Sequence, residues 1–192
     1  MFSVVNAILF RPLPVRDAGR LAVIASVRAP APRLGPVSFP DLQDYQAATR
    51  DLFENIAGYS VGFIGFAAQG ARPDRVLVTQ VTGNYFSLLG IQPAHGRLIR
   101  PDEGLPGRAD PVVVLGYSAW HRRFGGDPSV IGRKAMVNGQ PCTIAGVVPA
   151  EFVGTFASRS PSCTCPSIGP PGQCSTIEAL AASTRSRDCG RR

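Results

Sequence analysis

The sequence lacks three features that would assign it quickly to a functional class. Its apolar N-terminal run, Phe2–Phe10, has nine residues, whereas a bilayer span needs about 20. It contains no Gly-x-x-x-x-Gly-Lys-Ser/Thr phosphate loop, which excludes ATP hydrolysis by that route. It has only two histidines, and neither lies near the cysteines of the C-terminal region, so we expect no zinc site there.

The N-terminal run has the wrong charge order for a signal peptide. Arg11 follows Phe2–Phe10, whereas a signal peptide carries its positive charge before the apolar stretch. We interpret residues 1–14 as the remnant of a transmembrane helix and its exit, with Arg11 at the membrane interface. A buried N-terminal strand or helix is the alternative.

Charge and composition divide the chain near residue 156. The formal charge is +7, of which +4 falls in residues 1–156 and +3 in residues 157–192. Residues 157–192 are rich in Ser, Pro, Cys and Arg and contain no aromatic residue, so we predict a disordered tail. Out-of-frame translation of GC-rich DNA would produce this composition, and we favour that origin over a functional tail.

Four of the five cysteines lie in this tail: Cys163, Cys165, Cys174 and Cys189. A disulfide cluster among them would need an oxidising compartment and a packed partner, and neither is visible in the sequence. The fifth, Cys142, lies in an apolar strand pattern and is predicted to be a small core residue.

Residues 118–148 predict a short helix, a glycine turn and a complete β-hairpin. Lys134–Val137 and Cys142–Val148 are apolar, β-branched runs, and the Asn138–Gly139 pair between them suits a type I′ turn. Before the hairpin, Ala119, Trp120 and Phe124 predict a helix of one to two turns that ends at Gly125–Gly126.

The remaining segments alternate between strands and short helices. We predict strands at Leu21–Val27, Ile56–Ala67, Arg75–Thr82 and Val112–Leu115, a loop at Ala29–Pro36, and helices from Ser38 to about Arg50 and across Gly83–Gly90. Strands separated by short helices, with hairpins present, indicate an α+β fold with a mixed sheet.

The polar residues do not form a recognisable catalytic set. The candidates are His95, His121, Asp41, Asp44, Asp102, Glu103 and Asp127. Each has a plainer structural explanation in a turn or at a helix end, so we expect no enzyme activity and no cofactor. Arg122–Arg123 and Arg133–Lys134 raise the possibility of a nucleic-acid-binding module, but no aromatic and basic residues alternate as stacking sites require, and a solvated charged face is favoured.

Several motifs, taken in order and spacing, resemble a known family over about Met1 to Phe156. They are Val37–Asp41, Asn84–Phe86, Leu89–Arg97, Asp102–Glu103, Val112–Trp120, Arg123–Pro128, Ile131–Gly132, Val137–Gly139 and Thr143–Pro149. Together they resemble the MacB-like periplasmic core domain of FtsX-like ABC transporter permeases. The opening Asn6–Pro14 and Asp17, Arg20 and Leu21 are similar to duplicated permeases that lack a fused ATPase domain.

The resemblance implies a structural framework rather than an active site. The framework residues would be Pro40, Asp41, Asn84, Phe86, Gly90, Gly96, Arg97, Trp120, Phe124, Gly125, Gly126, Gly132, Asn138 and Gly139. Residues 15–156 would form the core domain, which is expected to be incomplete because the first membrane helix is only a remnant and later segments are missing.

The resemblance also implies a location and partners. The domain would lie on the periplasmic side of the bacterial inner membrane, where it would relay motion from a separate ATPase subunit or contact partner proteins. The remaining permease segments and the membrane would be partners in the intact transporter, and the exported substrate stays unidentified. The alternatives are an orphan soluble protein-binding domain and, less favoured, a basic nucleic-acid-binding module.

Overall fold

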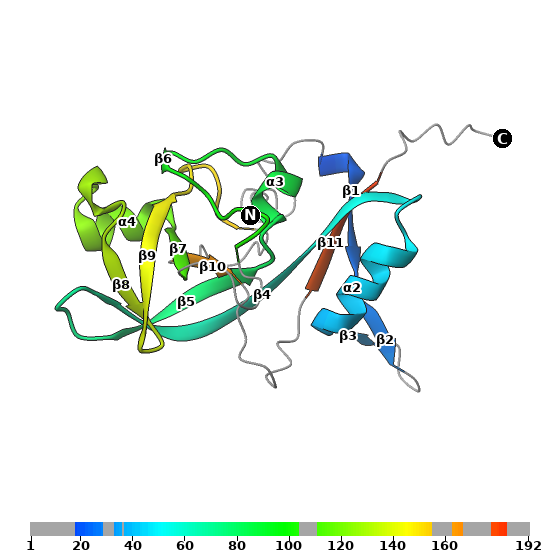
Figure 1. Cartoon of the computed structure of the whole chain (residues 1–192), viewed down its shortest axis with the longest axis horizontal. Helices are drawn as coiled ribbons and strands as arrows, with labels where there is room; N and C mark the ends of the chain where they lie inside the picture. Colours follow the sequence, from blue (N-terminus) through cyan, green and yellow to red (C-terminus); the bar gives the residue numbers. More distant parts are fainter. Residues whose placement is uncertain are drawn as a thin grey trace, which may run out of the picture.

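The computed structural model describes residues 18–28, 33–35, 37–103, 111–154, 163–166 and 178–183. Figure 1 shows a strand-rich molecule in which short helices cover parts of a strongly twisted sheet. Parallel and antiparallel strand pairs both occur, which confirms the predicted α+β class with a mixed sheet. Residues 1–14, for which we predict a membrane-helix remnant, lie outside the described residues.

Most of the described strands belong to one nine-stranded sheet. Its order is β1-β11-β4-β5-β10-β7-β9-β6, and β8 pairs with both β4 and β9. The strands are β1 (Leu21–Ile24), β4 (Phe53–Ala68), β5 (Asp74–Val81), β6 (His95–Gly96), β7 (Val112–Leu115), β8 (Lys134–Val137), β9 (Gln140–Val147), β10 (Cys163–Pro166) and β11 (Glu178–Ser183). Strands β2 (Ser26–Arg28) and β3 (Arg33–Gly35) form a separate antiparallel pair.

The helices begin and end close to where the sequence predicts. They are α2 (Phe39–Ala48), α3 (Tyr85–Leu89) and α4 (Tyr117–Phe124), with 3-10 turns η1 (Ala18–Arg20) and η2 (Pro128–Val130). Gly90 follows α3 and Gly125 follows α4, so both helices stop at the predicted glycines. Across the described ranges, none of the helices combines the length and apolarity that crossing a membrane requires.

Strand β4 organises the core because it runs through 16 residues and contributes to all three buried clusters. Side chains alternate between its two faces. On one face, Ile56 packs with Leu42 of α2, and further along Phe66 packs in the cluster that contains Trp120 of α4. On the other face, Tyr59 packs in the cluster with α3. In Figure 1, β4 extends from the α2 end of the molecule to the β8–β9 hairpin.

The β8–β9 hairpin has the predicted register and turn. Val137 pairs with Gln140, and the two turn residues Asn138 and Gly139 have φ of 49° and 79°. Positive φ at both positions is what a type I′ turn needs. The Asn138 side chain has a second role, because its Oδ1 accepts a hydrogen bond of 2.9 Å from the Gly65 amide of β4. The turn therefore anchors the hairpin to the central strand.

The structure differs from the sequence prediction before α2. The predicted strand Leu21–Val27 is divided at Ala25 into β1 and β2, which belong to different sheets. The predicted loop Ala29–Pro36 contains β3, which pairs with β2. Short strands of this kind depend on a partner for their hydrogen bonds, and the local sequence does not indicate that partner.

Two segments of the predicted tail are strands rather than disordered chain. Strand β10 lies between β5 and β7, and β11 lies between β1 and β4. Each of these strands is hydrogen-bonded along both of its edges. Main-chain groups form these hydrogen bonds, so a segment without a clear pattern of apolar side chains can still make them. The other residues of 157–192 lie outside the described residues.

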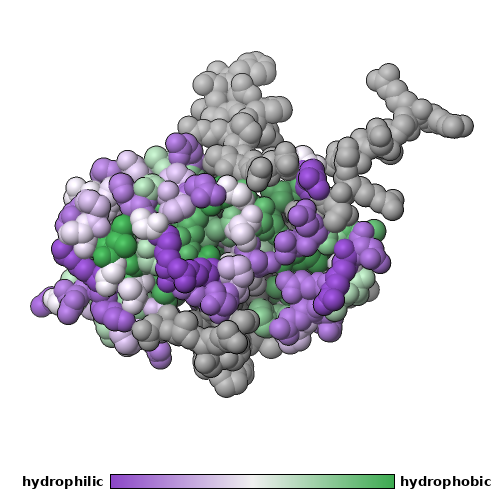
Figure 2. Space-filling view, turned by 45° about the horizontal axis from the view of Figure 1, so that its top comes forward, coloured by the Kyte–Doolittle hydropathy of each residue, from purple (hydrophilic) through white to green (hydrophobic). Residues whose placement is uncertain are grey.

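Hydrophobic surface remains uncovered at a few positions. Val23, Leu52 and Phe63 are 66%, 58% and 55% exposed. Figure 2 shows hydrophobic surface reaching the exterior between hydrophilic borders on one face of the molecule. The guanidinium of Arg75 covers part of the exposed Phe63 side chain, because it lies 4.9 Å from the centre of the Phe63 ring.

Candidate functional site

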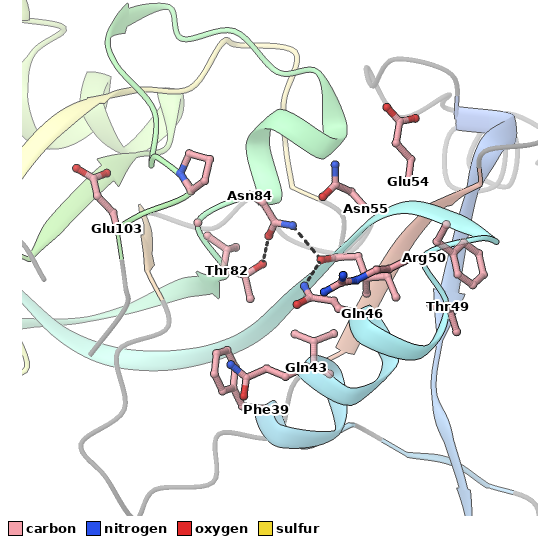
Figure 3. A pocket seen from close by; sticks show the side chains of 16 residues that line it. Phe39, Gln43, Gln46, Thr49, Arg50, Glu54, Asn55, Thr82, Asn84 and Glu103 are labelled. Carbon is pink, nitrogen blue, oxygen red and sulfur yellow. Dashed lines mark hydrogen bonds between the residues drawn. The ribbon is translucent and has the colours of Figure 1, made fainter. Parts of the chain in front are cut away.

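A pocket of about 620 Å³ opens where α2, the first part of β4 and the turn before α3 meet (Figure 3). Its lining combines aromatic and aliphatic side chains with amides and three charged groups. The lining residues are Phe39, Leu42, Gln43, Gln46, Thr49, Arg50, Phe53, Glu54, Asn55, Ile56, Val81, Thr82, Gly83, Asn84, Pro101 and Glu103. This volume lies within the range of about 300–1,000 Å³ that is typical of small-molecule sites.

Helix α2 forms one wall of the pocket, and Ser38 caps its N-terminus. Ser38 Oγ accepts a hydrogen bond of 3.3 Å from the Asp41 amide and donates one of 2.6 Å to Asp41 Oδ2. Pro40 lies in the first turn, where its missing N–H costs nothing. Leu42 then anchors the helix, since it is 1% exposed and packs on Ile56.

The backbone carbonyl of Ile56 joins the walls of the pocket. It accepts a hydrogen bond of 2.7 Å from Gln46 Nε2 of α2 and one of 2.9 Å from Asn84 Nδ2 before α3. Thr82 Oγ1 donates to Asn84 Oδ1 at 2.7 Å and orients that amide. We call these four residues the Ile56 clasp. It ties the α2 end of the molecule to the turn that begins the α3 cluster (Figure 3).

A bidentate ion pair closes the opposite side of the pocket. Arg97 Nη1 and Nη2 lie 2.9 and 2.7 Å from the two carboxylate oxygens of Glu103, and the Arg100 amide donates to Glu103 Oε2 at 2.9 Å. Burial raises the pKa of Glu103, but the hydrogen bonds from Arg97 and Arg100 and their positive charges outweigh it, so this pKa lies below its usual range. Hydrogen bonding to Glu103 raises the pKa of Arg97 in turn.

Next to this ion pair, the backbone of Arg100 and Pro101 packs closely against Gly83. A Cβ at Gly83 would collide with the backbone carbonyls of Arg100 and Pro101, so no larger residue fits there without a shift. Gly96, just before Arg97, has φ of 66° and lies against the Ala145 carbonyl of β9. Both glycines are required for close backbone approach, which positions the segment that carries Arg97 and Glu103.

Both histidines of the chain pack on Trp120. The rings of His95 and His121 have their centres 4.8 Å from the Trp120 ring. Trp120 is 4% exposed, and its Nε1 donates a hydrogen bond of 2.9 Å to the Asp127 carbonyl. The histidines therefore cover a core tryptophan from two elements, β6 and α4.

The other candidate catalytic residues each have separate local surroundings, and no hydrogen bond or ion pair across the residues that the structure describes joins them into one cluster. Asp41 serves the α2 cap, and Glu103 is held by Arg97. Asp127 caps η2; hydrogen bonds from Ser129 lower its pKa, and Arg133 lies 3.8 Å away. Asp44 and Asp102 are exposed. The described ranges contain no group of three or more His, Cys, Asp or Glu residues that could hold a metal ion.

The basic residues that suggested a nucleic-acid module are mostly engaged locally. Arg123 pairs with Asp74 at 2.8 Å and lies over the Phe66 ring. Arg133 donates to Ser129 at 2.6 Å. Lys134 donates to Thr143 at 2.9 Å. These groups are spread over α4, the turn after η2 and β8 rather than along one groove.

Sequence reasoning identified Asn84, Arg97 and Glu103 but missed the roles of Gln46 and Thr82. Gln46 is a half-buried polar residue of α2, and no local pattern points to its contact with a carbonyl ten residues later. Among the other framework positions, Phe86 is 2% exposed, Phe124 is partly buried, and Gly125, Gly126 and Gly132 have positive φ.

Comparisons with known proteins agree with this architecture. A family model described as the MacB-like periplasmic core domain matches residues 1–168. The periplasmic region of MacB from Actinobacillus actinomycetemcomitans aligns with a TM-score of 0.64 at 15% identity, covering 95% of this chain and 81% of that chain. The extracellular domain of the noncanonic ABC-type transporter YknZ from Gram-positive bacteria aligns with a TM-score of 0.60 at 12% identity, covering 85% and 83%. A comparison with curated proteins gave no match.

The two structural likenesses show a shared fold, and the family model adds the sequence evidence. That model extends twelve residues beyond the predicted boundary at Phe156 and includes β10. The mixed sheet, the glycine-dependent turns and the match over residues 1–168 lead to one conclusion: the chain belongs to the family of MacB-like periplasmic core domains, which are parts of ABC transporter permeases.

Proposed function

We propose that this chain is the non-catalytic extracytoplasmic part of an ABC-transporter-type permease and that it relays conformational change between membrane segments and partner proteins. The observation that carries the proposal is the continuity of β4. This strand contributes to every buried cluster and joins the α2 end of the molecule to the β8–β9 hairpin. Strand β4 pairs first with β11, then with β5 and finally with β8, so hydrogen-bonded ladders run without a break from one end of the strand to the other and a displacement at one end is passed to the other.

The Ile56 clasp supports the same role. Gln46 and Asn84 share one acceptor, so α2 cannot move away from the α3 turn without breaking a hydrogen bond. An unpaired amide at this partly buried position would cost about 1 kcal/mol or more. The clasp therefore favours movement of the two regions as one unit.

A separate subunit would have to supply the energy for transport. The sequence contains no phosphate loop, and the candidate acids and bases are scattered and engaged in caps and ion pairs. We infer that an ABC ATPase and the membrane segments of the permease are the partners of the intact assembly.

Cell fractionation tests the proposal. The full chain, tagged and expressed from its own locus with the neighbouring genes, should be cut by protease once the outer membrane is opened, while a cytoplasmic marker stays intact. An ABC ATPase should copurify with it from detergent-solubilised membranes. A chain that is protected with the cytoplasmic marker would contradict the proposed location.

The alternative is an orphan protein-binding domain. The exposed aromatic surface at Phe63 favours it, because large apolar side chains at the surface often mark contact sites. A chain that is periplasmic but copurifies with no ATPase, and that gives a photo-crosslink to one protein from position 63, would support this alternative over the transporter role.

A further inference from the structure

We propose that the pocket between α2 and β4 binds a small amphipathic carboxylate, with the carboxylate at Arg50 and an apolar body along α2 toward Phe39. This goes beyond the proposed transporter role and does not depend on it. The pocket volume of about 620 Å³ is large enough for a ligand of a few residues.

One of the charged side chains that line the pocket is a cation that has no partner among the described residues and can bind an anion. Three charged residues line the pocket, namely Arg50, Glu54 and Glu103. Glu103 is bound by both nitrogens of Arg97, and Glu54 lies 3.9 Å from Arg20. Among the described residues, Arg50 has no hydrogen bond or ion pair. The pocket therefore presents an unpaired guanidinium, whose planar donor pair matches a carboxylate.

Figure 3 shows how this guanidinium lies. Arg50 extends from the end of α2 into the space beside Gln46, close to the Ile56 clasp. The two acidic side chains of the lining lie away from Arg50, Glu54 at one side of the pocket and Glu103 at the opposite side. An anion that enters beside Gln46 thus meets Arg50 before it meets either carboxylate.

The rest of the lining suits an apolar body with amide groups. Phe39, Leu42 and Phe53 provide an apolar wall, and Leu42 belongs to a buried cluster. The Gln43 and Asn55 side chains make no hydrogen bond within the described part of the chain, so their amides can pair with those of a peptide.

The spacing along α2 sets the size of the ligand. Phe39, Gln43 and Gln46 recur at helical spacing on one face of α2, and Arg50 follows two residues after the helix ends at Ala48. At 1.5 Å per residue, the ten-residue helix is about 14 Å long. An extended tetrapeptide covers about 13 Å at 3.3 Å per residue, so it matches the length of α2 from the arginine end to the aromatic end.

Titration calorimetry on the full 192-residue chain tests this assignment. The probes are N-acetyl-Ala-Leu-Ala-Phe with a free carboxylate, the same peptide as its C-terminal amide, and decanoate. We expect the amide to bind about tenfold more weakly than the acid, because a charge-assisted bidentate contact is lost. Arg50→Gln should weaken binding of the acid by a similar factor, while Arg50→Lys should retain part of it.

Arg122→Gln is the matched control, since Arg122 is an exposed arginine of α4 that does not line the pocket. It should leave binding of the acid unchanged. If decanoate binds and its binding also weakens in Arg50→Gln, the result supports recognition of a carboxylate by Arg50. The natural ligand can then be a fatty acid as well as a peptide. If only the peptide acid binds, a peptide terminus is the source.

Three outcomes would overturn the proposal. They are equal affinity of the acid and the amide, equal effects of Arg50→Gln and Arg122→Gln, and no binding of any probe at 1 mM (roughly −4 kcal/mol). Circular dichroism melting curves establish that each variant is folded. Should Arg50→Gln not fold, the difference between acid and amide on the unmodified chain still decides the matter.

Discussion

Replacing Glu103 with glutamine should destabilise the domain by about 2 kcal/mol at pH 7. The Glu103 side chain is 7% exposed and accepts three hydrogen bonds, two from Arg97 and one from the Arg100 amide. Breaking a fully buried ion pair costs about 3–5 kcal/mol. Arg97 is 39% exposed, so water recovers part of its interaction, and the expected cost falls to about 1–3 kcal/mol.

The cost should depend on pH in a defined direction. Burial raises the pKa of Glu103 but the Arg97 and Arg100 contacts lower it more, so the folded protein binds fewer protons here than the unfolded chain. The contribution is therefore fully present above the unfolded pKa of about 4.3 and is lost as the pH falls through the lower pKa of the folded state. Urea unfolding at pH 7, 5 and 3.5 measures the difference between the original chain and Glu103→Gln.

Two further variants make this test specific. Glu54→Gln is the control, because Glu54 is 67% exposed and lies 3.9 Å from Arg20, and its loss should cost under about 0.5 kcal/mol. Arg97→Gln leaves burial as the main influence on Glu103, so the pKa of that carboxyl should rise and the variant should gain stability as the pH falls. A Glu103→Gln effect equal to that of Glu54→Gln, or one that is the same at pH 7 and pH 3.5, would refute the reasoning.

Other substitutions probe separate parts of the fold. Leu42→Ala should cost about 2–4 kcal/mol in urea unfolding, because it removes a 1% exposed anchor of α2. Asn84→Ala should cost about 1–2 kcal/mol and speed hydrogen exchange of the Gly58 amide, since Thr82 loses its partner in the clasp. Asn138→Ala should cost about 1–2 kcal/mol by chemical unfolding, because it loses both a tolerated positive φ and the bond to Gly65. The Cys142 thiol, whose pKa is raised by burial, should react with iodoacetamide only after urea unfolding, as read by peptide mass spectrometry; reaction at the rate of an exposed thiol in the native chain would be inconsistent with its position.

Local signals predicted the parts of the fold that local physics determines. Each of these parts depends on a few adjacent residues. They are the Asn138–Gly139 turn, the start of α2 at Ser38 with Pro40 in its first turn, and the ends of α3 and α4 at glycine. Apolar alternation was enough to locate β4 and β5, although β4 begins three residues earlier than predicted. Trp120 and Phe86, two of the framework positions, are buried, as is usual for large aromatic side chains.

Long-range pairing explains what the sequence did not predict. Glu178–Ser183 contains three alanines and none of the β-branched or aromatic residues that favour strands, and its place between β1 and β4 is set by the two open edges that it joins. The pocket was missed for the same reason, since its lining comes from α2, β4 and the residues around Asn84 and Glu103, which are separated by up to 64 positions. The ion pair between Arg97 and Glu103 joins residues only six positions apart, but it lies in a segment without helix or strand, where no periodic pattern brings two side chains together.

The position of β11 determines the order in which this domain can fold. Leu21 of β1 pairs with Ala182, so β1 has no place in the main sheet until residues about 160 positions later have been made. Until then the edge of β4 that receives β11 is open to pairing with another chain, which is a recognised aggregation hazard. The domain therefore completes its sheet only after residue 183 has been made, and until then this edge of β4 stays unpaired. Slow, late folding would also keep the chain extended long enough for passage across a membrane before its core closes.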